Sequence, residues 1–282
     1  MWPIFARFGN FELGSYGVLL VVAVLAAVYV AAALGKRDGL DPGRMVDVGV
    51  GTTFSGIAGS KLLGVVVALL AGVAVGWDEL RNAGAVHGGL MGGLLGAWLL
   101  CRHFKLPFGL ALDAYVPACA LGQAIGRLAC FSAGCCFGSA SHVPWAVTYH
   151  DPMAVTLGGV PLGVSVHPVQ LYDALAHVAF FALLWLAHRR AWMRGALFVP
   201  WVIGEGLLRF ALETFRGDLG RGVWFGLSWL STGRATSMAF VLAGAALAVL
   251  YARGAGPFSS RLVAQGRGAP SQSSTDSSLD AG

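Results

Sequence analysis

Two arginines stand where they could bind an anion, and a glutamate lies close to one of them. Arg127 follows one long apolar run, and Arg209 lies near the end of another. Guanidinium groups grip phosphate oxygens through parallel hydrogen bonds, so the two arginines together suit a phosphate, which in a membrane would be a lipid headgroup. Glu213 follows Arg209 by four residues and therefore shares its helix face. The pair forms either a simple intrahelical ion pair or part of a polar stripe facing other helices.

His87 is the best candidate for a proton acceptor. It is followed by Gly88, Gly89, Gly92 and Gly93 at the start of an apolar run. Imidazole titrates near neutral pH, which suits general-base chemistry. Glycines at helical spacing let another backbone or a lipid chain approach closely. The alternative is that this stretch serves helix packing alone.

The segment from His167 to Asp173 opens a later apolar run with several polar groups. A proline in the first turn and Tyr172 at headgroup level are typical of a helix that starts at a membrane interface. Gln170 and Asp173 favour an additional role. We expect one outward-facing cavity to gather this segment, the histidine of the glycine-rich stretch and both arginines.

Three of the five cysteines fall close together, at Cys130, Cys135 and Cys136. Their spacing contains no pair of CxxC motifs of the zinc-binding kind, so we expect no metal ion and no cofactor. The adjacent Cys135 and Cys136 support thiol chemistry at the outer face, or they are buried small apolar residues, or one of them is half of a structural disulfide.

Membrane helices must position these residues, because 56% of the 282 residues are hydrophobic and only 12% are charged. The sequence predicts an all-α integral membrane protein with about seven transmembrane helices. The first apolar run follows a polar start without a suitable cleavage site, so we interpret it as a retained span. The predicted spans are roughly 16–34, 46–75, 86–101, 108–126, 170–187, 195–213 and 231–252.

Basic residues follow every second span, which predicts the orientation of the chain. The loops after the first, third, fifth and last spans are the basic ones, and such loops are cytoplasmic by the positive-inside rule. The N-terminus is then periplasmic and the C-terminus cytoplasmic, with loops 77–85, 127–169 and 214–230 outside. The net charge of +5 is scattered over short loops, so nucleic acid is not an expected partner.

One transmembrane domain is expected over residues 1–255, with a small outward-facing head over about residues 127–169. That loop is long and rich in proline, and loops of this length are usually functional. Residues 256–282 are rich in serine, glycine and glutamine, which predicts a disordered cytoplasmic tail.

Several motifs, in order along the chain, resemble the bacterial prolipoprotein diacylglyceryl transferases, which are seven-helix inner-membrane enzymes. The resemblance covers most of the chain. Its motifs are Phe11 to Gly17, His87 to Gly92, Gly126-Arg127 with Phe131 and Gly138, His167 to Tyr172, Arg209-Phe210 with Glu213 and Arg216, and Thr232-Gly233.

The resemblance implies transfer of the diacylglyceryl group of phosphatidylglycerol to the lipobox cysteine of a prolipoprotein signal peptide. A thioether forms and glycerol phosphate leaves, on the periplasmic side of the cytoplasmic (inner) membrane. Arg127 and Arg209 would hold the phosphate, His87 would accept the thiol proton, and Glu213 would orient Arg209. The substrate-binding residues implied by the motifs are Tyr16, Gly88, Gly89, Gly126, Gly138, His167, Gln170, Tyr172 and Arg216.

The family signature is altered in the cysteine-rich stretch. A thiol is a weak hydrogen-bonding group and does not replace an amide or a carboxylate in holding a headgroup. Two other readings therefore stay open: a diverged member that binds phospholipid but uses another acceptor or thiol chemistry, and a non-enzymatic lipid-binding protein. The departures are Ala129 for glycine, Cys130 and Ala133 for asparagine, Cys135 for glutamate, Lys61 for arginine and Arg234 for glutamine.

Overall fold

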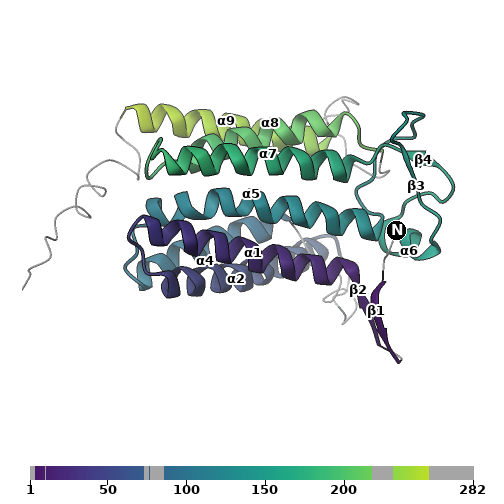
Figure 1. The fold of residues 1–282 in the computed structure, drawn as a ribbon, viewed down its shortest axis with the longest axis horizontal. Coiled ribbons are helices and arrows are strands. Elements are labelled where there is room, and N and C mark those ends of the chain that lie inside the picture. The colour runs from purple at the N-terminus through teal and green to yellow at the C-terminus, as the bar shows by residue number, and fades with distance from the viewer. Residues whose placement is uncertain (1–3, 10, 73–75, 77–85, 218–230, 254–282) are drawn as a thin grey trace, which may run out of the picture.

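The computed structural model describes residues 4–9, 11–72, 76, 86–217 and 231–253, and within these ranges the long helices run side by side in one bundle (Figure 1). Each predicted span overlaps one of these helices, although residues 73–75 of the second span lie outside the described residues. Five of the helices are long and apolar enough to cross a membrane. The long helices are α1 (Ser15–Arg37), α2 (Pro42–Leu70), α4 (Val86–His103), α5 (Phe108–Ala133), α7 (Val169–Arg189), α8 (Phe198–Glu213) and α9 (Thr232–Ala252).

The prediction of a helical integral membrane protein is confirmed at this level. The chain also has short strands that the sequence did not predict. Before α1, β1 (Ile4–Phe8) and β2 (Phe11–Gly14) form an antiparallel hairpin that turns at Gly9, which has a φ of 60°. Arg7 and Glu12 face each other in its register and form an ion pair of 3.1 Å. An interstrand pair of opposite charge stabilises such a ribbon.

Helix α5 joins the two halves of the bundle. It packs against α1 on one side and α7 on the other, while α2 pairs with α4 and α8 pairs with α9 (Figure 1). The predicted span ended at residue 126, but α5 continues to Ala133 and ends only where Gly134 adopts a left-handed conformation, with a φ of 74°. Arg127 is therefore inside the helix, not at its boundary as the sequence suggested.

The glycine-rich start of α4 packs on α2. A Cβ atom at Gly59 would lie 2.4 Å from the carbonyl oxygen of Gly88 and 2.9 Å from the Cα of Gly92. Only glycines permit so close an approach of two helical backbones. Of the two predicted partners for these glycines, a backbone or a lipid chain, the structure places a backbone against Gly88 and Gly92.

A small head covers the bundle at the end where α5 finishes (Figure 1). It contains β3 (Val147–Thr148), α6 (Pro152–Gly158) and β4 (Ser165–Val166), with a core that includes Phe137, Tyr149 and Val160. Burial raises the pKa of Tyr149 to about 12, so its hydroxyl stays protonated.

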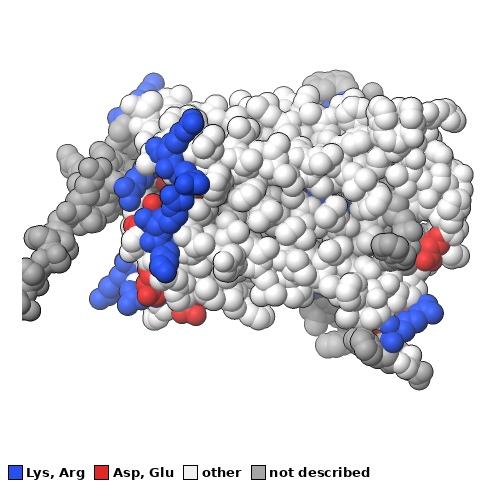
Figure 2. Space-filling view, viewed as in Figure 1, with Lys and Arg blue, Asp and Glu red and all other residues white. Residues whose placement is uncertain are grey.

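Lysine and arginine gather at the opposite end of the bundle, and the face between the two ends is almost free of charge in the view of Figure 2. The basic end holds the C-termini of α1, α4 and α7, which carry Lys36, Arg37, Arg102 and Arg189. Asp113 caps this end, since it accepts hydrogen bonds from the backbone N–H groups of Gly195 and Leu197. Its carboxylate therefore holds the start of α8 (Phe198–Glu213) against α5.

Candidate active site

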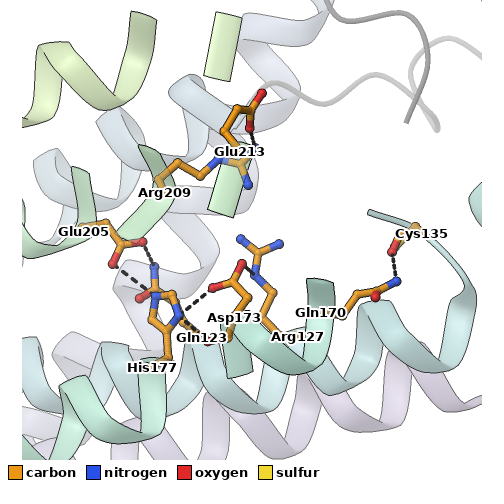
Figure 3. A network of polar contacts seen from close by, with 9 residues as sticks. All are labelled: Gln123, Arg127, Cys135, Gln170, Asp173, His177, Glu205, Arg209 and Glu213. Carbon is orange, nitrogen blue, oxygen red and sulfur yellow. Dashed lines mark hydrogen bonds and ion pairs between the residues drawn. The ribbon is translucent and has the colours of Figure 1, made fainter. Parts of the chain in front are cut away.

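Helices α5, α7 and α8 each direct a short polar stripe into the bundle (Figure 3). Residues four apart lie on one helix face, so each stripe follows from its spacing. Within a membrane such residues are costly unless they pair. The stripes are Gln123 and Arg127 on α5, Asp173 and His177 on α7, and Glu205, Arg209 and Glu213 on α8.

Arg127 has its anionic partner inside the protein. Its Nε lies 2.7 Å from Oδ2 of Asp173, and the Asp173 side chain is only 3% exposed. The two terminal nitrogens of Arg127 point away from this carboxylate (Figure 3), and among the described residues no hydrogen bond engages them. The carboxylate thus fixes the guanidinium through one nitrogen and leaves its other donors for a second anion.

His177 links α7 to α8 behind this pair. Its Nδ1 lies 2.8 Å from Oδ1 of Asp173, and its Nε2 lies 3.2 Å from Oε2 of Glu205. Gln123 donates from Nε2 to the other oxygen of Glu205 at 3.0 Å. The result is one continuous polar chain from Arg127 to Gln123. The sequence analysis did not single out His177 or Gln123, although they lie four residues from Asp173 and Arg127, respectively.

Arg209 and Glu213 form the intrahelical ion pair that the spacing predicted, with Nη2 of Arg209 3.4 Å from Oε2 of Glu213. The carboxylate is also held by the start of α9, because Ser231 donates from Oγ to its other oxygen at 2.8 Å. A Cβ at Gly233 would lie 2.5 Å from this carboxylate. Glu213 is therefore clamped between its own helix and α9. Arg234, from the same turn, lies over the Phe210 ring at 5.9 Å.

The segment from His167 to Tyr172 contacts the turn that follows α5, residues 134–138, which we call the signature turn. Gln170, which is 1% exposed, donates from Nε2 to the carbonyl of Cys135 at 2.8 Å and to the Tyr149 hydroxyl at 3.3 Å. Nδ1 of His167 lies 3.1 Å from the Tyr172 hydroxyl. The structure thus brings this segment against the turn that follows α5.

Backbone bonds also tie the signature turn to the end of α8. Gly138 and Arg216 form an antiparallel bridge, and Ser139 donates from its backbone N–H to the carbonyl of Phe215 at 2.8 Å. A Cβ at Gly138 would lie 2.5 Å from the carbonyl oxygen of His167. A larger residue than glycine would therefore separate these two segments.

The remaining predicted site residues lie around this centre. His87 is exposed at the start of α4, and within the described part of the chain no hydrogen bond or ion pair joins it to Arg127 or Arg209. The adjacent Gly89 approaches Gly56 of α2, and Lys61 lies on that same helix. The structure thus places His87 on the α2 and α4 pair, separate from the polar chain of α5, α7 and α8.

Gly126 is partly exposed and Tyr16 is exposed. A Cβ at Gly126 would meet no described atom within 4 Å, so this glycine faces open space. Tyr16 is 41% exposed in the first turn of α1. Next to Tyr16, a mostly apolar cavity of about 790 Å³ is lined by Ile4, Phe5, Ser15, Val18, Leu19, Phe131 and Ser132.

The three clustered cysteines come together in space. The Sγ atoms of Cys130, Cys135 and Cys136 all lie within 4.8 Å of one another, and each residue is partly buried. All five cysteines of the chain are free thiols, so the alternative of a structural disulfide is absent from this structure. Hydrogen bonds from the thiols of Cys130 and Cys135 lower the pKa of Cys136, and the positive charges of Arg216 and Arg127 add to this effect. The spacing alone did not predict this cluster.

Comparison with known proteins shows the family of this chain. The family model described as "Prolipoprotein diacylglyceryl transferase" matches residues 3–250. Among similar proteins, the phosphatidylglycerol--prolipoprotein diacylglyceryl transferase of Clostridium tetani is 30% identical over 249 residues, which is 86% of this chain and 95% of the relative. Proteins of the same name from Finegoldia magna and Geobacter sulfurreducens are 28% and 29% identical, over 84% and 89% of this chain and 90% and 95% of their own lengths. The chain belongs to the prolipoprotein diacylglyceryl transferase family.

Proposed function

We propose that this chain is a diacylglyceryl transferase that uses phosphatidylglycerol as donor and the cysteine of a prolipoprotein as acceptor. Its family and the names of its relatives support this activity. In the reaction the acceptor sulfur attacks the glyceryl carbon that carries the phosphate ester. A carbon–sulfur bond forms, the carbon–oxygen bond to phosphate breaks, and its electron pair leaves with glycerol phosphate.

The proposal rests mainly on the positions of Arg127 and Arg209, which lie at the same height along the axes of two neighbouring helices. Gln123 of α5 contacts Glu205 of α8, and each arginine lies one turn beyond its contacting residue. Both helices run from the basic end toward the head end (Figure 1), so the arginines share one level on neighbouring helices.

Each arginine is also positioned by a carboxylate, by Asp173 for Arg127 and by Glu213 for Arg209. Side chains that are already oriented stabilise a departing anion without reorganisation at the moment of reaction. We infer that these two guanidinium groups bind the phosphate of the donor and stabilise the glycerol phosphate that leaves.

The remaining roles follow the motifs. His87 accepts the proton of the attacking thiol, since the thiolate is the nucleophile. The apolar cavity beside Phe131 takes up apolar parts of the substrates, and Gly126 leaves room next to Arg127. Gln170 acts through the turn it holds, since both of its bonds go to protein groups. Tyr16, Gly88, Gly89, Gly138, His167, Tyr172 and Arg216 complete the surroundings of the bound substrates.

The membrane orientation belongs to the same proposal. The basic end faces the cytoplasm, and the head and both arginines face the periplasmic side of the inner membrane. The gathering of lysine and arginine at one end of the bundle supports this orientation by the positive-inside rule. The acceptor is then the lipobox cysteine of a signal peptide that reaches the outer half of the membrane.

A rescue assay tests the transferase activity. Expression of this chain in bacteria depleted of their own enzyme restores diacylglyceryl modification of a lipobox protein, measured by mass spectrometry. Variants Arg127→Ala and His87→Ala abolish the rescue although the protein inserts normally, whereas Arg189→Ala at the basic end retains it. Absence of rescue by correctly inserted wild-type protein would show that the proposal is wrong.

The thiol cluster favours a second candidate, a family member that transfers the group to another acceptor. Purified protein with phosphatidylglycerol vesicles and no lipobox peptide distinguishes the two. Release of glycerol phosphate only when the peptide is present supports the first function. Release with a different thiol compound, and none with the peptide, supports the second.

A further inference from the structure

The end of α5 and the turn that follows bring three thiols to one point. Cys130 lies in the last turn of the helix, and Cys135 and Cys136 follow the left-handed Gly134. Their sulfur atoms lie within 4.8 Å of one another. Metal–sulfur bonds of about 2.3 Å around one ion in a planar triangle require sulfur–sulfur distances of about 4 Å. Small side-chain rotations therefore suffice to close the triangle.

The backbone that carries the thiols is held firmly. Cys135 donates from its backbone N–H to the carbonyl of Cys130 at 3.2 Å, and its own carbonyl accepts from the buried Gln170 at 2.8 Å. Cys136 has a φ of 58°, in the left-handed region that non-glycine residues rarely adopt. A site whose ligands are fixed in advance loses little entropy on binding an ion.

The ligand set indicates which ion it suits. Thiolates are soft ligands that select monovalent copper, zinc and iron–sulfur clusters. Structural zinc is almost always four-coordinate. Among the described residues, the cluster contains three cysteines and no fourth histidine, cysteine or carboxylate. Three thiolates complete the coordination of monovalent copper, which accepts a three-coordinate geometry.

The charges around the cluster complement such a site. Three thiolates and one monovalent cation leave an excess of negative charge. The positive charges of Arg216 and Arg127 act on Cys136 and offset part of that excess. The thiols are also only partly buried, so an ion can reach them.

We propose that Cys130, Cys135 and Cys136 form a binding site for one monovalent copper ion on the head side of the bundle. The site takes a reduced, thiophilic cation and needs no redox step. It does not depend on the transferase activity, because its readout is bound metal.

Competition for copper tests the site. The full-length protein is purified in detergent under anaerobic, reducing conditions, and five thiols are titrated before copper is added. Wild-type protein then withholds about one equivalent of Cu⁺ from a chromophoric chelator. Cys130→Ser, Cys135→Ser and Cys136→Ser each weaken binding by more than about 100-fold, since loss of even an outer partner of a metal ligand costs 10–100-fold. Cys119→Ser, on the same helix as Cys130, serves as the matched control and binds as wild type.

X-ray absorption at the copper edge supplies a measurement that does not depend on variants folding well. Three sulfur neighbours in wild-type protein, and copper–sulfur distances near those of thiolate sites, support the proposal. It is overturned if wild-type protein withholds no Cu⁺ from the chelator, or if copper is bound through nitrogen or oxygen ligands. It is equally overturned if zinc is retained and copper is not, or if two of the three thiols resist titration as a disulfide.

Discussion

Asp173 binds Arg127 through one carboxylate oxygen and approaches His177 with the other, at 2.7 and 2.8 Å. Among the described residues the arginine is thereby held through its Nε, and its terminal nitrogens point away from this carboxylate (Figure 3). Asp173, which was not among the predicted catalytic residues, thus orients Arg127, the arginine predicted to bind phosphate.

Asp173→Asn removes the negative charge that orients Arg127. Removal of one partner from a buried ion pair typically costs about 3–5 kcal/mol, so both thermal stability and turnover fall. We expect turnover to fall by more than the loss of folded protein explains, as measured with phosphatidylglycerol vesicles and a lipobox peptide. Asp38→Asn is the matched control, since Asp38 pairs with His188 at the basic end. Equal effects of both variants on turnover would contradict a positioning role.

Arg127→Lys keeps the positive charge but loses the planar fork. An ammonium group does not present one donor to Asp173 and a parallel pair to a phosphate in a fixed geometry. We expect turnover to fall on the order of 100-fold, comparable to loss of one donor to a transition-state anion. Steady-state kinetics measure the change, and Arg189→Lys leaves them unaltered. Full activity of the lysine variant would mean that only charge matters at this position.

His177→Phe leaves the carboxylates of Asp173 and Glu205 without their shared partner. An unsatisfied buried polar group costs about 1–3 kcal/mol, so we expect a lower unfolding temperature in detergent. His150→Phe is the control, because His150 is exposed in the head. A variant as stable as the control would show that the polar chain contributes nothing to folding.

Gly233→Ala places a Cβ where the Glu213 carboxylate now lies, at 2.5 Å. The carboxylate must move and lose its bond from Ser231 or its contact with Arg209. We expect reduced turnover with little loss of stability, and partial recovery when Glu213→Asp is added, because the shorter side chain leaves room. Gly17→Ala, at a position where a Cβ meets no described atom within 4 Å, is the control. Unchanged turnover in Gly233→Ala would remove Glu213 from the positioning of Arg209.

Gly59→Ala forces α4 away from α2, because the added Cβ would lie 2.4 Å from the carbonyl oxygen of Gly88. Overpacking of this kind typically costs about 1–3 kcal/mol. Since His87 precedes Gly88, turnover should fall together with stability. Gly56→Ala, one turn earlier on α2, is the matched control, because its added Cβ would lie 3.4 Å from the nearest atom, the carbonyl oxygen of Gly89. If the two variants behave alike in thermal unfolding and turnover, the close helix contact has no part in placing His87.

The helices were predictable because each long apolar run has to satisfy its backbone inside the membrane. The end of α5 was not, because Gly126 and Gly134 look alike in the sequence and only Gly134 adopts the left-handed conformation that ends the helix. The partner of Arg127 was likewise hidden. Which face of α7 packs against α5 depends on contacts between the helices. The spacing of polar residues predicts only that each helix has a polar stripe, not which stripes meet.

The intrahelical pair of Arg209 and Glu213 was predictable, since a spacing of four determines it. The thiol cluster was not predictable from spacing rules. Those rules describe ligands on a single turn, whereas Cys130 meets Cys135 and Cys136 through the reversal of the chain at Gly134.

Cys136 has a left-handed backbone conformation that destabilises the fold, and it also supplies one of the three clustered thiols. Such a conformation costs a non-glycine residue about 1–2 kcal/mol, and glycine adopts it without that strain. Replacement of Cys136 by glycine would therefore relax the turn while removing a sulfur ligand. The chain retains its third thiol at the expense of a more stable fold.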